Sequence, residues 1–271
     1  MELGLVELYR QTKDVRHLNL AIDLIERRGK GLNGWDCEKI EELNRIHGFH
    51  FPCEYFQDHL PFEKQTRLRG HAVRGIYFLT AIVDVAIETG KPEYIAAAKR
   101  LWESLITHDI SITGSIGAFG RYEDIGERYD IPINSYNESC AACGMANCAA
   151  KMLRLEPSGK HADILEDVLY NGILHGISLD GKSFFAQNPL NGNKQRGNDN
   201  WICCPPNVSR TLLGIGRYIY TKSEDHIYVN LYIGNKSKVQ LKDVELDMNI
   251  SGNYTWNGEA VIKPNPTNSS E

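Results

Sequence analysis

The chain has 271 residues, of which 42% are hydrophobic and 24% are charged. These proportions are close to those of an average soluble globular protein, so they exclude a disordered or fibrous chain. Thirty Lys and Arg residues against 35 Asp and Glu residues give a net charge of -5, without the basic excess of a nucleic-acid-binding surface.

The first part of the chain predicts two helical hairpins. Apolar residues recur at helical spacing from Leu3 to Gln11, and a second helix follows Asp14 and ends near Gly29. About 77 residues later a similar unit begins, with a helix from Tyr77 to Thr89 and another that starts at Pro92. Repeated helix pairs that bury only one face each are typical of a solenoid or a closed ring of hairpins.

A third hairpin is expected after the second one. Its first helix runs from Cys140 to Leu155, and its second from Lys160 to Asn171. Two long segments, Lys30 to Leu60 and Ile110 to Asn137, connect the hairpins. Because connections of this length are uncommon in a compact domain, we expect them to be functional or partly structured.

After about Tyr220 the apolar pattern changes from helical periodicity to strict alternation. Strands are predicted over His226–Ile233 and Val239–Leu246, with turns after each of them. The sequence therefore predicts a mainly α chain, with a partial ring of helical hairpins over residues 1–221 and the first strands of a β-sandwich over residues 222–271.

The start of the chain and its apolar runs bear on its location. No run approaches the roughly 18 apolar residues of a membrane span, and the first residues lack the cationic start of a signal peptide. We therefore expect a soluble, cytoplasmic chain with no membrane partner.

The seven cysteines are unevenly distributed. Their odd total does not suit a disulfide framework, and Cys37 and Cys53 are isolated in the sequence. The other five crowd two short segments, which indicates reduced thiols with a chemical role. They are Cys140, Cys143, Cys148, Cys203 and Cys204.

Adjacent Cys203 and Cys204 are poorly spaced for a mutual disulfide, whereas both thiolates can reach one soft metal ion, and zinc is the natural candidate. The following Pro205 and Pro206 stiffen the loop. Two ligand sets remain open from the residues alone. The first set is a closed structural site made of Cys140, Cys143, Cys203 and Cys204. The second set has one oxygen ligand and is made of Glu138, Cys140, Cys203 and Cys204.

Five motifs in one order give the sequence a wider resemblance. It resembles the β-L-arabinofuranosidases of glycoside hydrolase family 127 over nearly its whole length. The motifs are Gly70-His71-Ala72-Val73-Arg74, Tyr129-Asp130-Ile131-Pro132, Glu138-Ser139-Cys140-Ala141, Asp167-Val168-Leu169-Tyr170-Asn171-Gly172 and Cys203-Cys204-Pro205-Pro206-Asn207-Val208-Ser209-Arg210.

The resemblance implies a retaining glycoside hydrolase in an (α/α)6 barrel, which releases L-arabinose from β-L-arabinofuranosides or arabinofuranosyl oligosaccharides. It implies that Cys203 is the nucleophile and that Cys143 only packs. The zinc ligands implied are Glu138, Cys140, Cys203 and Cys204.

The acid/base residue implied by the resemblance is Glu123, which precedes the Tyr-Asp-Ile-Pro motif by six positions. Glu127 is the rival assignment, because the following segment is one residue shorter than in the family. Desolvation in an aromatic, Gly-rich loop is expected to raise the pKa of Glu123. His71 and Glu166 are the predicted sugar-binding residues, and Glu166 lies beside an apolar helical stripe where an unpaired charge is costly.

The resemblance is incomplete at both ends. Family members have further barrel helices before the first hairpin and a longer β region. A ring without some of its hairpins exposes apolar edges, which predicts a homo-oligomer or a companion chain that completes the barrel. The alternative function is a truncated zinc-binding remnant without turnover.

Overall fold

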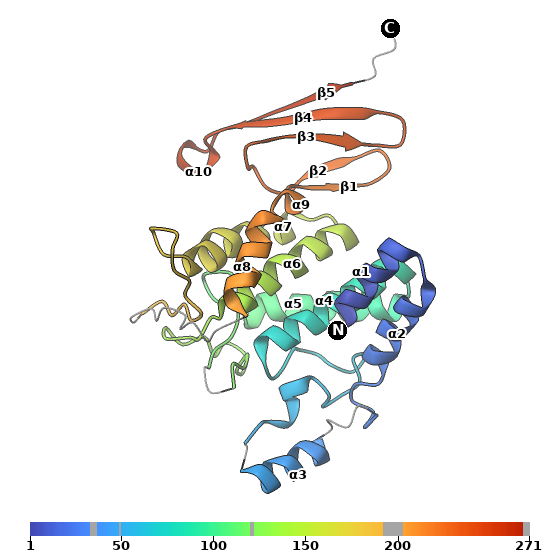
Figure 1. The fold of residues 1–271 in the computed structure, drawn as a ribbon, viewed down its shortest axis with the longest axis vertical. Helices are drawn as coiled ribbons and strands as arrows, with labels where there is room; N and C mark the ends of the chain where they lie inside the picture. The colour runs from blue at the N-terminus through green and yellow to red at the C-terminus, as the bar shows by residue number, and fades with distance from the viewer. Residues whose placement is uncertain (33–36, 49, 120–121, 192–202, 268–271) are drawn as a thin grey trace.

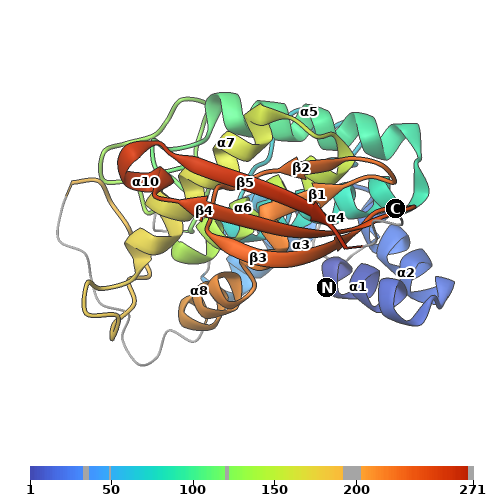
Figure 2. The ribbon, with the colours of Figure 1, turned by 90° about the horizontal axis from the view of Figure 1, so that it is seen from above.

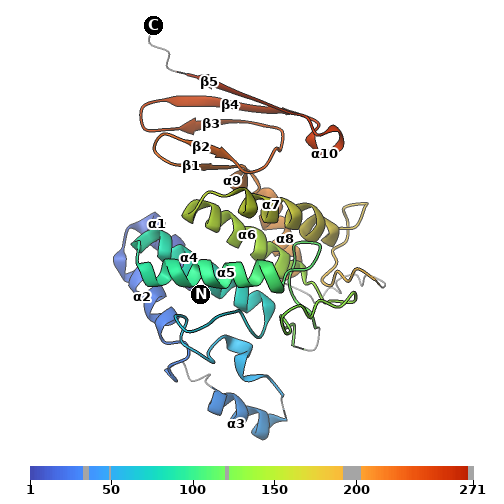
Figure 3. The same ribbon diagram turned by 180° about the vertical axis from the view of Figure 1, so that it is seen from behind.

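The computed structural model describes residues 1–32, 37–48, 50–119, 122–191 and 203–267. Most helices gather in one body, the strands lie at one end of it, and α3 lies at the opposite end (Figures 1 and 3). The helices within the described residues are α1 (Glu2–Thr12), α2 (Val15–Glu26), α3 (Cys37–His47), α4 (Ala72–Thr89), α5 (Pro92–His108), α6 (Ser139–Leu155), α7 (Gly159–Asp167), α8 (Cys204–Leu213), α9 (Gly216–Ile219) and α10 (Tyr254–Asn257).

Helix α4 is the central helix of the body. All of its residues from Phe78 to Ala86 are buried, which is the pattern of a helix covered on every side. It packs against α1, α2, α5 and α6. The contact with α6 is close because Gly144 lies there, where a Cβ atom would come within 2.5 Å of the Ile76 side chain.

The three predicted hairpins are confirmed as α1 with α2, α4 with α5, and α6 with α7. Gly90 ends α4 in the left-handed conformation, with φ of 64°, and Pro92 occupies the first turn of α5. Beyond α7 the chain continues as a π-helical turn over Val168–Ile173 and a 3-10 turn over Leu174–Gly176. The second helix of the third hairpin is therefore irregular beyond Asp167.

The described residues of the β region form two small antiparallel sheets. Strand β1 (Tyr220–Lys222) pairs with β2 (Ile227–Val229), and the second sheet has the order β3 (Asn235–Gln240), β4 (Glu245–Gly252) and β5 (Ala260–Pro266). Seen from above, this second sheet extends over the helical body (Figure 2). The predicted fold class, a partial barrel of helical hairpins followed by the first strands of a sheet region, is confirmed. The predicted domain boundary at residues 221 and 222 falls within β1 and stays a prediction.

The strand predicted over Val239–Leu246 is wrong. Val239 lies in β3 and pairs with Leu246 of β4. In the turn between the two strands, Leu241 N–H donates to the Val244 carbonyl at 2.9 Å. The apolar residues Leu241 and Val244 are three positions apart, so the alternation breaks at this turn, and the prediction overlooked that break. The other predicted strand, His226–Ile233, is shorter than expected, since β2 covers only Ile227–Val229.

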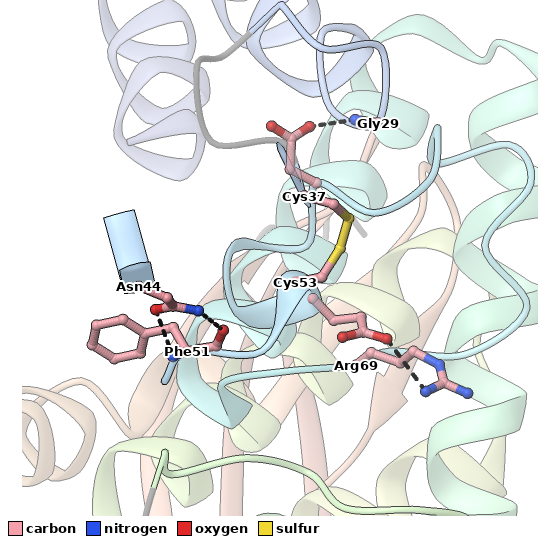
Figure 4. Close-up of a disulfide and its surroundings, with 8 residues drawn as sticks. Gly29, Cys37, Asn44, Phe51, Cys53 and Arg69 are labelled. Carbon is pink, nitrogen blue, oxygen red and sulfur yellow. Dashed lines mark hydrogen bonds and ion pairs between the residues drawn. A yellow bond between two sulfur atoms is a disulfide. The ribbon is translucent and has the colours of Figure 1, made fainter. Parts of the chain in front are cut away.

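The long segment from Lys30 to Leu60 is partly structured, as expected. It contains α3 and the 3-10 turn η1 (Cys53–Phe56). The Asn44 side chain exchanges two hydrogen bonds with the Phe51 backbone, at 2.8 and 3.0 Å, and folds the chain back on itself (Figure 4). This brings Cys53 to Cys37, with a Cα–Cα distance of 4.7 Å, and the two form a disulfide. The odd number of cysteines, which argued against a disulfide framework, therefore did not exclude this single disulfide.

None of the helices in the described part of the chain combines the length and apolar character needed to cross a membrane.

Candidate functional site

The predicted metal ligands lie where two helices begin side by side. Glu138 immediately precedes α6 and Cys140 lies in its first turn, whereas Cys203 immediately precedes α8 and Cys204 is its first residue. Helix α6 packs against α8. The first turn of a helix carries partial positive charge from its free N–H groups, which favours thiolates and carboxylates there.

The ligand atoms of these residues lie within 4.8 Å of one another. The Cys204 sulfur is 3.3 Å from that of Cys140 and 3.8 Å from that of Cys203. Oxygen Oε1 of Glu138 is 3.4 Å from the Cys204 sulfur and 3.8 Å from the Cys203 sulfur. The four side chains therefore surround one common point.

These separations fit a tetrahedral metal site. Zinc bonds of about 2.3 Å to sulfur and about 2.1 Å to oxygen would place ligand atoms roughly 3.6 to 3.8 Å apart. In addition, the Glu138 side chain is almost fully buried, and its Oε2 has no hydrogen-bond partner among the described residues. A buried carboxylate is costly unless it is paired or binds a metal. The cluster can thus hold a metal ion.

Electrostatics lead to the same conclusion. Burial raises the pKa of Glu138, and burial together with Cys140 raises the pKa of the Cys203 thiol to about 11. Without a cation, the Cys203 thiol would therefore keep its proton at neutral pH. A bound metal ion inverts this preference and deprotonates a coordinating thiol outright.

Cys143 does not belong to this group of ligand atoms. It is buried on α6, where burial raises its pKa to about 12. It also lines a cavity of about 560 Å³ together with Asn207 and Arg210 of α8. Of the two ligand sets that the residues left open, the structure brings together the one that contains Glu138.

The predicted sugar-binding His71 and the predicted acid/base Glu123 form a direct pair. Backbone hydrogen bonds join their segments, from Ala72 N–H to the Glu123 carbonyl at 2.8 Å and from Ile125 N–H to the Gly70 carbonyl at 3.0 Å. The side chains meet at 2.7 Å, between His71 Nε2 and Glu123 Oε2. His71 Nδ1 accepts from Val73 N–H, so the ring proton lies on Nε2 and is donated to Glu123.

Glu123 has a second donor, the Tyr136 hydroxyl, 3.1 Å from its Oε1. The hydrogen bond from His71 is the main cause that lowers the pKa of Glu123, and it outweighs the effect of burial. Our expectation of a raised pKa is therefore wrong for this structure. Desolvation alone suggested a raised value, but the sequence did not reveal that two donors would stabilise the carboxylate.

Glu138 connects the two parts of the site. One of its oxygens lies within 4.8 Å of ligand atoms of both His71 and Glu123, in a group separate from the sulfur cluster. The thiol cluster and the His71–Glu123 pair are therefore neighbours across a single carboxylate.

Glu127, the rival acid/base candidate, has a different environment. Its side chain is 70% exposed and forms ion pairs with Arg67 at 2.7 Å and Arg69 at 3.2 Å. Both of its oxygens are thus engaged by guanidinium groups, and Glu127 belongs to neither group of ligand atoms. The geometry favours Glu123.

Glu166, the other predicted sugar-binding residue, is not brought to either group of ligand atoms. Its carboxylate on α7 accepts a hydrogen bond from the Tyr254 hydroxyl of α10, at 3.4 Å. Burial raises its pKa, as the apolar surroundings in the sequence indicated. Its role in sugar binding stays a prediction.

Sequence reasoning missed two residues of the site. Tyr136 lies two positions before Glu138 and contacts Glu123, and Asn207 of the last motif donates from Nδ2 to the Cys140 sulfur at 3.1 Å. The motif could have pointed to Asn207, since it lies one helical turn after Cys203. Nothing in the pattern around Tyr136 distinguished it from a core tyrosine.

Known proteins that are similar to this chain belong to one family of glycoside hydrolases. The family model of the GH127 catalytic domain of beta-L-arabinofuranosidases matches residues 1–217. A curated relative from Bifidobacterium longum subsp. longum, a non-reducing end beta-L-arabinofuranosidase, is 33% identical over 95% of this chain and 42% of its own length.

Solved structures are similar over nearly all of this chain. A GH127 beta-L-arabinofuranosidase from Geobacillus stearothermophilus T6 has a TM-score of 0.88 and 30% identity, over 98% of this chain and 44% of that one. A second GH127 beta-arabinofuranosidase has a TM-score of 0.86 and 35% identity, over 97% and 39%. The chain thus spans less than half the length of these relatives. It belongs to glycoside hydrolase family 127, the beta-L-arabinofuranosidase family.

Proposed function

We propose that this chain carries the active site of a retaining glycoside hydrolase that releases L-arabinose from β-L-arabinofuranosides. One observation supports this most strongly: the Cys203 sulfur lies in a cluster of metal-ligand atoms, and a single carboxylate separates that cluster from the His71–Glu123 pair. A retaining glycosidase needs a nucleophile and an acid/base group close to each other. The substrate class follows the names of the relatives.

Zinc is the metal we propose for Glu138, Cys140, Cys203 and Cys204. Three thiolates and one carboxylate at tetrahedral separations suit Zn²⁺, whereas magnesium and calcium prefer oxygen ligands only. Bound there, the ion would supply one thing to the reaction, namely an ionised Cys203 at neutral pH.

The first half of the reaction uses Cys203 and Glu123. The Cys203 sulfur forms a bond to the anomeric carbon, the bond from that carbon to the leaving oxygen breaks, and Glu123 gives its proton to that oxygen. In the second half, Glu123 takes a proton from water, whose oxygen forms a bond to the anomeric carbon while the carbon–sulfur bond breaks. Two inversions give net retention of configuration.

His71 and Tyr136 hold the Glu123 carboxylate through its two oxygens. Their hydrogen bonds favour the ionised form, which is the form that accepts a proton from water in the second half. The first half uses the protonated form, so the rate should fall on the alkaline side of the pKa of Glu123. The one ring proton of His71 lies in its hydrogen bond to Glu123, so the binding of the sugar by His71 stays a prediction.

Hydrolysis of p-nitrophenyl β-L-arabinofuranoside, with zinc supplied, tests the proposal. Proton NMR of the first sugar released should show the β-anomer, and Cys203→Ala should abolish release. Metal analysis should find one zinc ion per chain. Release of the α-anomer first, or full activity in Cys203→Ala, would contradict the proposed chemistry.

A second candidate function is zinc binding without turnover, which the cluster of ligand atoms alone would support. Bound zinc together with no release of p-nitrophenol would favour this candidate. Light scattering of the active and inactive preparations would test the predicted homo-oligomer or companion chain.

A further inference from the structure

The motif that begins with the cysteine pair continues into α8, and the proposed reaction leaves two of its polar residues unused. Asn207 and Arg210 lie three positions apart on the same face of this helix. Asn207 N–H donates to the Cys203 carbonyl at 3.2 Å, so Asn207 begins one helical turn after the proposed nucleophile. The helix thereby fixes the position of the Asn207 backbone relative to Cys203.

Asn207 contacts the metal-ligand cluster from outside. Its Nδ2 donates to the Cys140 sulfur at 3.1 Å, within the usual range for a hydrogen bond to sulfur. Cys140 belongs to α6, so this bond crosses from one helix to the other. The Asn207 amide thus holds the Cys140 sulfur from the side of α8.

Arg210 determines which way the Asn207 amide points. The Arg210 guanidinium donates to Asn207 Oδ1. Arginine has five donors and no acceptor, so only the amide oxygen can face it, and the NH2 group must then face Cys140. The backbone carbonyl of Asn207 is held as well, because it accepts from the Thr211 hydroxyl at 2.9 Å.

We propose that Asn207 is a positioning residue of the metal site, which holds and orients the Cys140 sulfur as a ligand, and that Arg210 fixes the amide in the orientation this requires. The inference rests on the proposed metal site and adds a role for two residues that do not bind the ion. Hydrogen bonds to ligand atoms commonly change metal affinity by about 10- to 100-fold.

Substitutions here can be made without disturbing the core. Asn207 and Arg210 line the cavity of about 560 Å³ between α1, α6, α8 and β1, and Arg210 is exposed. Asn147 lines the same cavity from α6 and supplies a matched control. Its amide differs from that of Asn207 in having no sulfur partner among the described contacts.

The test is competition for Zn²⁺ between the purified chain and a chromophoric chelator. Asn207→Ala should weaken Zn²⁺ binding by about 10- to 100-fold, whereas Asn147→Ala should leave it unchanged. Arg210→Ala should weaken Zn²⁺ binding less than Asn207→Ala does. Arg210→Lys should keep most of the affinity, because the ammonium group can still donate to Asn207 Oδ1. Equal affinity in Asn207→Ala and the unsubstituted chain would overturn the proposal.

Co²⁺ in place of Zn²⁺ gives a second readout. Without the donor from Asn207, the thiolate-to-metal charge-transfer band should move to longer wavelength and keep its intensity, since all three sulfurs still bind. An unshifted band would overturn the inference even if the affinity fell, because a general loss of structure could cause that fall. Failure of the unsubstituted chain to bind either ion would instead overturn the proposed metal site, and this inference with it.

Discussion

Two sulfur-containing regions of this molecule differ in how their cysteines come together. Cys37 and Cys53 are 16 residues apart and are joined directly, in a segment that folds back beside α3. Cys140 and Cys204 are 64 residues apart and meet at the ends of two packed helices, with a carboxylate between them and the His71–Glu123 pair. The first region closes a loop, whereas the second concentrates groups that favour a cation.

The difference shows that spacing along the chain is a poor guide to what a cysteine does. Cys140 and Cys143 form a CxxC pattern, yet Cys143 lies outside the ligand group. Both residues belong to α6, but only Cys140 is in its first turn, beside the first residue of α8. Position at a helix end therefore separates the candidate ligand Cys140 from Cys143.

Removing one sulfur from each region should give the largest difference in zinc affinity between the two regions. Cys204→Ser should lose at least about 100-fold in Zn²⁺ affinity, since a thiolate ligand is replaced by a weak hydroxyl. Cys143→Ser and Cys53→Ser should bind zinc like the unsubstituted chain. Chelator competition measures all three, and tight binding by Cys204→Ser would contradict the ligand set.

The second prediction compares the two candidates for the acid/base residue, Glu123 and Glu127. Glu123→Gln should slow hydrolysis of arabinofuranosides with poor leaving groups by about 10²- to 10⁴-fold, the usual contribution of a general acid. Activated aryl arabinofuranosides should be much less affected in their first step. Glu127→Gln, at an exposed ion-paired position, is the control, and a larger loss there than in Glu123→Gln would reverse the assignment.

The third prediction concerns the disulfide region. Closing a loop of this length stabilises a fold by about 3 kcal/mol in the chain-entropy account. Cys37→Ser should therefore lower the free energy of unfolding by about that amount in urea denaturation, while zinc binding stays intact. Loss of zinc in this variant would show that the two regions are coupled.

The smallest expected effect is a shift in pH dependence. Tyr136→Phe removes one donor to the Glu123 carboxylate, so the pKa of Glu123 should rise. A general acid works only while protonated, and activity is lost as pH rises through its pKa. The alkaline limb of the profile of kcat/KM against pH should therefore move to higher pH in Tyr136→Phe. A shift to lower pH would contradict the role of this hydrogen bond.

Much of the helical body could be predicted because its signals are local. Gly90 and Pro92 mark the end of α4 and the start of α5, and the apolar stripes gave the three hairpins. The turn between Val239 and Leu246 was missed because a three-residue step between the apolar residues Leu241 and Val244 is its main local signal, and one such step is weak evidence for a turn.

The candidate site divides in the same way. The motifs pointed to Glu138, Cys140, Cys203 and Cys204, and the structure brings their ligand atoms together. The lowered pKa of Glu123 and the contact between Asn207 and Cys140 depend on side chains from separate elements. The Cys37–Cys53 disulfide depends on how Asn44 and Phe51 fold the chain back, which no spacing rule contains.

The central claim is that one metal ion binds to three sulfurs and one carboxylate oxygen. X-ray absorption at the zinc edge of the metal-loaded chain tests it most directly. We predict three sulfur neighbours at about 2.3 Å and one oxygen at about 2.0 to 2.2 Å, with the oxygen contribution lost in Glu138→Ala. A shell of four sulfurs, or a shell without sulfur, would contradict the account.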